Sequence, residues 1–221
     1  ARPQAPSLDF ELAKARIKAR YEGSPANNVD SYLAQIKKRK YAHKAAAEYG
    51  LALSYHENKE YNKAQNLLEK LQLSDKNNLF YIDALSDVYI QAKSYDKAIA
   101  MLSDLNLLMP NNQVVTLNYA NVLQEAKKYA QAEVLLQDFL LVKPGHFIAY
   151  DLLASVYRKQ GQKAKMHSAK AEVFALLGAY SKAIDELQTA YNFAEDQPLV
   201  KKRIKARILQ FQAQEDKLKR L

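Results

Sequence analysis

A four-residue pattern recurs along this chain at a fixed interval. The segments YNKA, YDKA and YAQA occupy residues 61–64, 95–98 and 129–132, so each lies 34 residues from the next. Turn-forming stretches recur in step with them, as DKNN at 75–78, MPNN at 109–112 and KPGH at 143–146. An interval of this length indicates a repeat array, in which each unit buries its apolar face only against its neighbours. The sequence therefore predicts a stack of similar units.

The composition predicts that these units are helical. The 221 residues include only 5 Gly and 6 Pro, and Ala, Leu, Lys, Gln and Glu are abundant, which favours helix nearly everywhere. The absence of Cys excludes disulfides, thiol catalysis and Cys-ligated zinc. No apolar run approaches the roughly 18 residues of a membrane span. We expect an all-α chain built from helix pairs.

The pattern resembles the tetratricopeptide repeat (TPR). In the unit 79–112, Ser86 and Tyr89 fall where the family has a small and a large residue on the first helix, and Ala98 falls at its close helix crossing. Pro110 falls at its closing turn. The resemblance implies a superhelical solenoid of antiparallel helix pairs. It covers almost the whole chain.

The interval slips once, near the end of the array. The signature returns as YSKA at 180–183, and Ala183 lies 51 residues after Ala132, which is one and a half units. We therefore predict that the helix near 163–177 is shared, as the second helix of one pair and the first helix of the next. The predicted organisation is a linker remnant at 1–6, a degenerate N-terminal helix pair at 7–44, three regular 34-residue units at 45–146, irregular units sharing one helix at 147–197, and a basic capping helix at 198–221.

One short segment suggests metal chemistry. Residues 56–60 read HENKE, one letter short of the HExxH zinc motif. Asn58 and Lys59 are turn residues, so His56 and Glu60 need not share a helical face, and the other histidines fall in distant units. No Gly-rich phosphate loop and no Ser–His–Asp set is apparent. We predict an ordinary polar turn, no catalytic residue, no metal or cofactor in this chain, and no enzymatic activity.

The resemblance also implies a partner-binding groove lined by the first helices. Its geometry directs the following side chains inward: Tyr49, Leu53, His56, Phe80, Asp83, Asp87, Ile90, Leu117, Asn121, Gln124, Ile148, Asp151, Ser155 and Arg158. This mixture of apolar and acidic residues suits an extended or helical peptide with apolar anchors and basic residues. The alternative is that the apolar ones simply pack the inner wall. Asp83 and Asp87 would repel a C-terminal carboxylate, which excludes the chaperone-type carboxylate clamp.

The ends of the chain carry its positive charge. The net charge is +6 over 1–44, −3 over 45–200 and +6 over 201–221. A nucleic-acid binder more often has a continuous basic stripe, so we interpret the ends as solvated faces of terminal helices. Binding of nucleic acid or an anionic surface through them is the less favoured alternative.

The end segments support a closer resemblance. SLDFELAKARIKARY entering the array, the basic helix RIKARILQFQAQ and the half-unit slip are similar to the TPR region of periplasmic β-barrel assembly-enhancing zinc metalloproteases. The resemblance implies a periplasmic docking module whose zinc lies only in a catalytic domain absent from this sequence. The implied partners are the barrel-assembly machinery, outer-membrane protein substrates and the protease domain itself. A free-standing TPR adaptor of pilus or secretion assembly is the alternative.

Overall fold

Helices account for all regular structure in the part of the chain that is described. The computed structural model describes residues 6–220 and places twelve α-helices and no strand in that range. Apart from Pro6, the predicted linker remnant at 1–6 lies outside the described residues. The chain divides into two compact units, an N-terminal body (Ala1–Met109) and a C-terminal body (Pro110–Leu221), and each is described by itself. The prediction of an all-α fold is confirmed.

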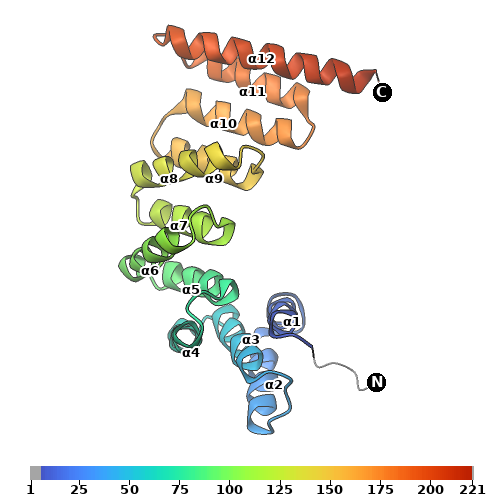
Figure 1. Ribbon diagram of the computed structural model, residues 1–221, viewed down its shortest axis with the longest axis vertical. Helices are drawn as coiled ribbons and strands as arrows, with labels where there is room; N and C mark the ends of the chain where they lie inside the picture. Colours follow the sequence, from blue (N-terminus) through green and yellow to red (C-terminus); the bar gives the residue numbers. More distant parts are fainter. Residues whose placement is uncertain (1–5, 221) are drawn as a thin grey trace. The chain divides into compact units, whose positions relative to one another are not determined.

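The N-terminal body contains six helices. They are α1 (Leu8–Tyr21), α2 (Pro25–Lys37), α3 (Lys44–Glu57), α4 (Tyr61–Ser74), α5 (Leu79–Gln91) and α6 (Tyr95–Leu108). From α2 onward each helix packs against the next, whereas α1 packs chiefly on α3 (Figure 1). The sequence predicts α1 and α2 as a degenerate helix pair. In the structure α1 packs mainly on α3, so α1 and α2 do not form a simple hairpin.

The C-terminal body also contains six helices. They are α7 (Gln113–Glu125), α8 (Tyr129–Val142), α9 (Phe147–Lys159), α10 (Lys163–Leu176), α11 (Tyr180–Asn192) and α12 (Pro198–Lys219). Each packs against the next, and Figure 1 shows α10, α11 and α12 lying one upon another. No helix within residues 6–220 is both long enough and apolar enough to cross a membrane.

The turn inside each helix pair has the same geometry. Lys59, Lys93, Lys127 and Gly161 follow one another at 34-residue intervals, and each has a positive φ between 55° and 73°. The next residue donates its N–H back to a carbonyl five positions earlier, as Glu60 does to Tyr55 at 2.8 Å. These are Schellman motifs, which end a helix by satisfying its last carbonyls. Gly178 adopts the same conformation 17 residues after Gly161, so the turn itself repeats at the half-unit slip.

The repeated alanines form the helix crossings. One alanine lies fourth in each of α4, α6, α8 and α11, and all four are 0% exposed: Ala64, Ala98, Ala132 and Ala183. Each is followed four residues later by a bulky side chain on the same helical face, namely Leu68, Leu102, Leu136 and Leu187, none of which is more than 2% exposed. A side chain larger than a methyl group at the alanine would separate the two backbones.

The shared helix predicted near 163–177 is α10. It packs against both α9 and α11, and Ala171 at its centre is 0% exposed. Ala164 and Ala171 of α10 belong to a core cluster with α11 and α12, which contains Ile204 and Phe211 of α12. α12 therefore directs its buried apolar side chains to this cluster, as a capping helix does.

Candidate partner-binding surfaces

The predicted inward residues form two surfaces, one in each body. The α3/α5 face consists of Tyr49, Leu53, His56, Phe80, Asp83, Asp87 and Ile90 in the N-terminal body. The α7/α9 face consists of Leu117, Asn121, Gln124, Ile148, Asp151, Ser155 and Arg158 in the C-terminal body. The structure brings the members of each face together on neighbouring helices, because residues at the same unit position repeat on the same side of each first helix.

The α3/α5 face is already covered by α1. The Arg16 guanidinium donates to the Tyr49 hydroxyl oxygen through Nε at 3.0 Å and Nη2 at 2.9 Å. The same Nη2 lies 3.0 Å from Oδ2 of Asp83, and the guanidinium sits 4.9 Å from the centre of the Phe80 ring. One arginine of α1 thus contacts three of the residues predicted to bind a partner.

A second arginine repeats the contact one turn later. Arg20 Nη2 lies 3.0 Å from Oδ2 of Asp87, and Asp83 and Asp87 are themselves one turn apart on α5. Both pairs keep more than a quarter of each side chain exposed, so solvent screens them and each contributes at most about 1 kcal/mol. The two pairs therefore fix the position of α1 more than they stabilise the fold.

The buried side of α1 consists of one leucine and two alanines. Leu12, Ala15 and Ala19 are each no more than 5% exposed, and they lie on the side of α1 that packs on α3. Tyr49 and Leu53 of α3 are 0% and 1% exposed. The side chains of Tyr49 and Leu53 are therefore packed inside the N-terminal body, and neither is available to contact a partner in this structure. The sequence could not show this, because it does not reveal that α1 covers the face.

The carboxyl group of Asp87 titrates in an unusual environment. Burial raises the pKa of Asp87 above its ordinary value, nearby Asp83 raises it further, and the positive charge of Arg20 opposes both. A carboxyl whose pKa is higher in the folded than in the unfolded state binds more protons when folded. Its contribution to stability therefore falls as the pH rises through the folded-state pKa.

We expect Asp87→Asn to remove this pH dependence. Relative to the wild type, the variant should gain stability as the pH rises from about 3 to about 7, because it has no carboxylate to desolvate. The gain should be small, since 39% of the Asp87 side chain is exposed. Urea unfolding at a series of pH values measures it. Asp104→Asn, at an exposed position of α6, controls for the change in net charge, and equal pH profiles for the two variants would contradict the prediction.

His56 and Glu60 have different side-chain partners. Its Nδ1 lies 3.4 Å from Glu57 Oε1, its ring packs against Tyr61 at 5.5 Å, and its buried Nε2 finds no hydrogen-bond partner among the described residues. Glu60 instead pairs with Lys63. Within residues 6–220, no group of three or more His, Asp and Glu side chains gathers as metal ligands would. The segment 56–60 is the end of α3 and its Schellman turn.

The α7/α9 face is more open. Ile148 is 40% exposed, and its neighbour Phe147 is 46% exposed. Asp151 and Arg158 are exposed, while Leu117, Asn121, Gln124 and Ser155 are partly buried. These residues have the composition expected of a protein-binding patch, in which apolar groups lie among charged ones.

A small cleft adjoins this face. Asp151, Ser155 and Arg158 of α9 line it together with Met166 and Lys170 of α10, and its volume is about 150 Å³. This space admits a side chain or two of a partner. The predicted residues of α9 and two residues of α10 that the sequence did not single out thus form one polar depression.

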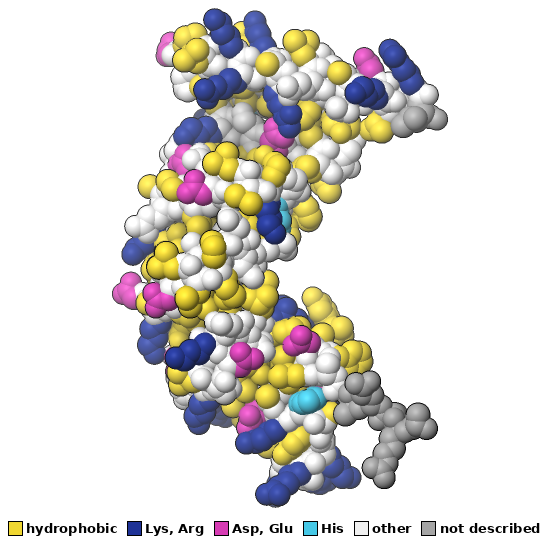
Figure 2. Space-filling view, in the orientation of Figure 1, with side chains coloured by type: hydrophobic (Ala, Val, Ile, Leu, Met, Phe, Trp, Pro, Cys, Tyr) yellow, Lys and Arg dark blue, Asp and Glu magenta, His cyan; other side chains and the backbone are white. Residues whose placement is uncertain are grey.

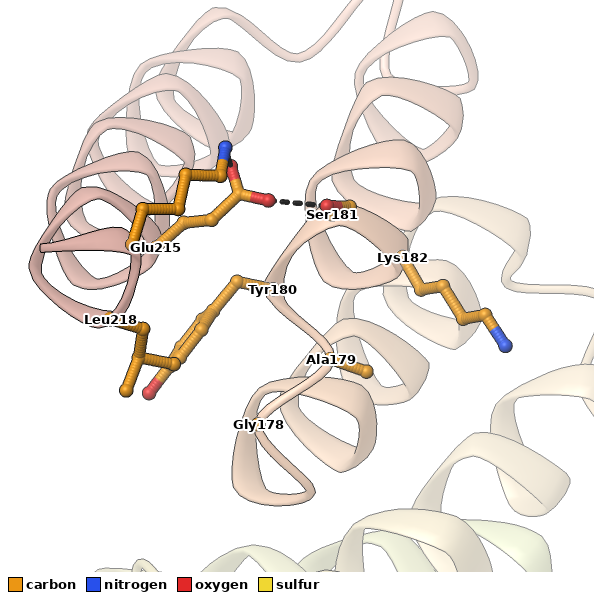
Figure 3. A pocket seen from close by; sticks show the side chains of 8 residues that line it. Gly178, Ala179, Tyr180, Ser181, Lys182, Glu215 and Leu218 are labelled. Atoms are coloured by element: carbon orange, nitrogen blue, oxygen red, sulfur yellow. Dashed lines mark hydrogen bonds and ion pairs between the residues drawn. The ribbon is translucent and has the colours of Figure 1, made fainter. Parts of the chain in front are cut away.

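A larger cleft lies where α12 passes the start of α11. Its volume is about 410 Å³, and eight residues line it: Gly178, Ala179, Tyr180, Ser181, Lys182, Glu215, Leu218 and Lys219. Figure 3 shows the Tyr180 ring beside Leu218, with Ser181 bonded to Glu215 and Lys182 directed away.

The arginines of the two end helices were not among the predicted site residues. Arg207 of α12 donates to both carboxylate oxygens of Glu172 on α10, at 2.8 Å from Nε and 2.6 Å from Nη2. Figure 2 shows Lys and Arg side chains of this end of the C-terminal body lying among hydrophobic ones. The segment RIKAR, present at both 16–20 and 203–207, was the signal that could have identified Arg16, Arg20 and Arg207.

Comparison with known proteins matches one part of the chain to a family. Residues 89–155 match the family model described as tetratricopeptide repeat. A putative β-barrel assembly-enhancing protease of Vibrio cholerae is 41% identical over 85 residues, 38% of this chain. A β-barrel assembly-enhancing protease of Yersinia pestis is 30% identical over 86 residues, 39% of this chain. The matched region spans only 18% of the length of either relative.

Solved structures support the same fold. A tetratricopeptide repeat protein from Parabacteroides merdae aligns with a TM-score of 0.58 at 15% identity, covering 89% of this chain and 82% of its own. MamA from Desulfovibrio magneticus RS-1 aligns with a TM-score of 0.51 at 17% identity, covering 78% and 96%. At such identities the likeness concerns the fold alone. The chain is therefore an all-α protein with the tetratricopeptide-repeat solenoid fold, and its residues 89–155 carry repeats of that family.

Proposed function

We propose that this chain is the protein-docking module of a longer protein related to the β-barrel assembly-enhancing proteases, and that it performs no reaction itself. The observation that carries the proposal is the match to two relatives of that name, at 41% and 30% identity. The fold supports it, because tetratricopeptide repeats bind proteins and peptides. Because the match spans 18% of each relative, we assign any zinc-dependent proteolysis to a catalytic domain outside this sequence.

The same relationship suggests where the module works. We propose a periplasmic location and a partner from outer-membrane protein assembly, which is the barrel-assembly machinery, an outer-membrane protein substrate or the protease domain itself. The names of the relatives support this class of partner.

The α7/α9 face is the surface that we assign to this partner. It offers Ile148 and Phe147 as exposed apolar anchors beside the charged cleft of Asp151, Arg158 and Lys170. A few large apolar side chains surrounded by polar ones supply most of the binding energy in typical interfaces. The α3/α5 face is less suited to binding this partner, because α1 covers it.

Binding to a purified barrel-assembly complex tests the proposal. Ile148→Glu should weaken binding of the 221-residue chain at least about tenfold, or about 1.4 kcal/mol, because a carboxylate would be buried in an apolar contact. Biolayer interferometry measures the affinity and circular dichroism confirms the helix content. Val134→Glu, on α8 of the same body at a position 57% exposed, is the matched control and should bind as the wild type does.

Two outcomes would contradict this assignment. Equal affinities of the two glutamate variants would place the partner elsewhere on the chain. No binding to the complex, together with DNA binding that weakens steeply between about 50 and 200 mM salt, would favour the nucleic-acid alternative.

A further inference from the structure

The pentapeptide Arg-Ile-Lys-Ala-Arg forms an ion pair with a carboxylate of another helix in both bodies. In α1 it is residues 16–20, and in α12 it is residues 203–207. The last arginine of each copy reaches a carboxylate on another helix: Arg20 reaches Asp87 of α5, and Arg207 reaches Glu172 of α10. Both acidic residues are the ninth of their repeat units, counted from 79 and from 164. In each body, therefore, an acidic residue at the ninth position of a repeat unit pairs with an arginine of an end helix, α1 or α12.

The two docked helices are held differently. Ile204 of α12 is 4% exposed and belongs to the core cluster, whereas Ile17, its counterpart in α1, is 53% exposed. The buried side of α1 consists of Leu12, Ala15 and Ala19, which offers little apolar area for its 14 residues. α12 is therefore part of the core of its body, while α1 is held by one leucine, small side chains, two arginines, and hydrogen bonds with Asn28, Ser31 and Tyr32 of α2.

α1 joins α2 through a short connection, and its release would break two hydrogen bonds from Asn28 Nδ2 to the carbonyl oxygens of Lys18 and Glu22, at 3.2 and 2.6 Å. α1 ends at Tyr21, and α2 begins at Pro25. Gly23, between them, has a φ of +66°, a conformation that glycine adopts without strain. Ser24 caps α2 through its own hydroxyl, so α2 does not need α1 to begin. Rotation about residues 22–24 would move α1 from the face.

We propose that the α3/α5 face is a receptor for a partner's amphipathic helix that carries two arginines one turn apart, and that α1 is the resident helix that such a partner replaces. The charges match in spacing, because Arg16 and Arg20 are four residues apart on α1, as Asp83 and Asp87 are on α5. The pattern to be recognised is Leu-x-x-Ala-Arg-x-x-Ala-Arg, as α1 presents it from Leu12 to Arg20. This site is distinct from the α7/α9 face and stands whether or not the proposed function holds.

The receptor distinguishes arginine from lysine at the first basic position. Arg16 bonds to Tyr49 through two nitrogens, contacts Asp83 and lies over the Phe80 ring. A planar guanidinium makes all of these contacts at once, whereas an ammonium group has neither the fork nor the flat face. A partner helix must therefore carry arginine, and a general positive charge is insufficient.

A peptide of residues 7–23 is the probe. Labelled with fluorescein, it is titrated with the full chain and followed by anisotropy. The chain with Arg16→Ala and Arg20→Ala should bind it about tenfold more tightly than the wild type, because a weakened α1 leaves the face open more of the time. A chain with Lys14→Ala, at an exposed position of α1, should bind as the wild type does.

A second peptide tests the chemistry of recognition. With lysine in place of both arginines it keeps its charge, and it should bind the double-alanine chain about tenfold more weakly than the native peptide. Equal affinity of the two peptides would overturn the proposal, as would equal affinity of the native peptide for the wild-type and double-alanine chains. A dimer of the wild-type chain in analytical ultracentrifugation, formed by exchange of α1, would assign the face to a second copy and would also overturn it.

Amide hydrogen exchange on the wild-type chain tests the proposal without any variant, so it works even if the substituted chains do not fold. Excess native peptide should accelerate amide exchange in α1 and leave α3 and α5 as protected as before, because the peptide takes the place of the released helix. Unchanged exchange in α1 at a peptide concentration that saturates the anisotropy signal would show that the peptide binds elsewhere, against the proposal.

Discussion

Ala98→Glu should unfold the N-terminal body of the chain. Ala98 lies in the first turn of α6 and is 0% exposed, and Ser86 on the preceding helix α5 is also 0% exposed. A glutamate there must either bury an unpaired charge or separate the two helices. We expect a loss of about 4 kcal/mol or more, seen in thermal unfolding by circular dichroism as an early transition that involves part of the helix signal.

The matched control lies two residues away. Ala100→Glu changes the same residue type on the same helix, but Ala100 is exposed, so its effect should stay within about 0.5 kcal/mol. If both variants melted with the wild type, the assignment of the 34-residue units and their crossings would be wrong.

Gly50→Ala should destabilise the packing of α2 on α3. A Cβ built on Gly50 would lie 2.4 Å from Cζ and 2.7 Å from the hydroxyl oxygen of Tyr32. The Tyr32 ring is 4% exposed, so it has no free space to move into. Alanine is favoured over glycine in a helix by about 1 kcal/mol, but overpacking costs up to about 3 kcal/mol, so we expect a net loss of up to about 2 kcal/mol. Urea unfolding measures it.

A double-mutant cycle with Tyr32→Leu identifies the cause. The smaller side chain leaves room for the new methyl group, so Gly50→Ala should cost less in the Tyr32→Leu background than in the wild type. The expected coupling is about 1 kcal/mol or more. A stabilising effect of Gly50→Ala alone, or strict additivity of the two changes, would show that the ring does not restrict this position.

The repeat architecture could be predicted because it rests on local periodicity. Ala98 and Ala132 are 34 residues apart, and each is the small residue of a crossing with 0% exposure. The turns at Lys93 and Lys127 have φ of 55° and 60°, as equivalent positions of one motif should. Such features need only neighbouring residues and the adjacent unit, so a single sequence contains most of the information.

The binding surfaces were less predictable. Family geometry placed Asp83 and Asp87 on a face directed toward a partner, and the structure places them on that face with α1 as the occupant. It also assigned Tyr49 and Leu53 to the same face, where both are fully packed. The direction in which a side chain points and its exposure to solvent are separate properties. Its exposure depends on which other segment of the chain packs over that face.

The amino-acid sequence by itself determined the helices, their 34-residue pairing and the half-unit slip at α10, because helix propensity, turn residues and the spacing of small and large side chains act over short distances. Only the tertiary structure decided that α1 lies across α3 and α5. Arg20 and Asp87 are 67 residues apart, and α1 carries small apolar residues and arginines that could have met several surfaces. Its place follows from the simultaneous match of two charges, one aromatic ring and a small apolar side, which exists only after the repeats have stacked.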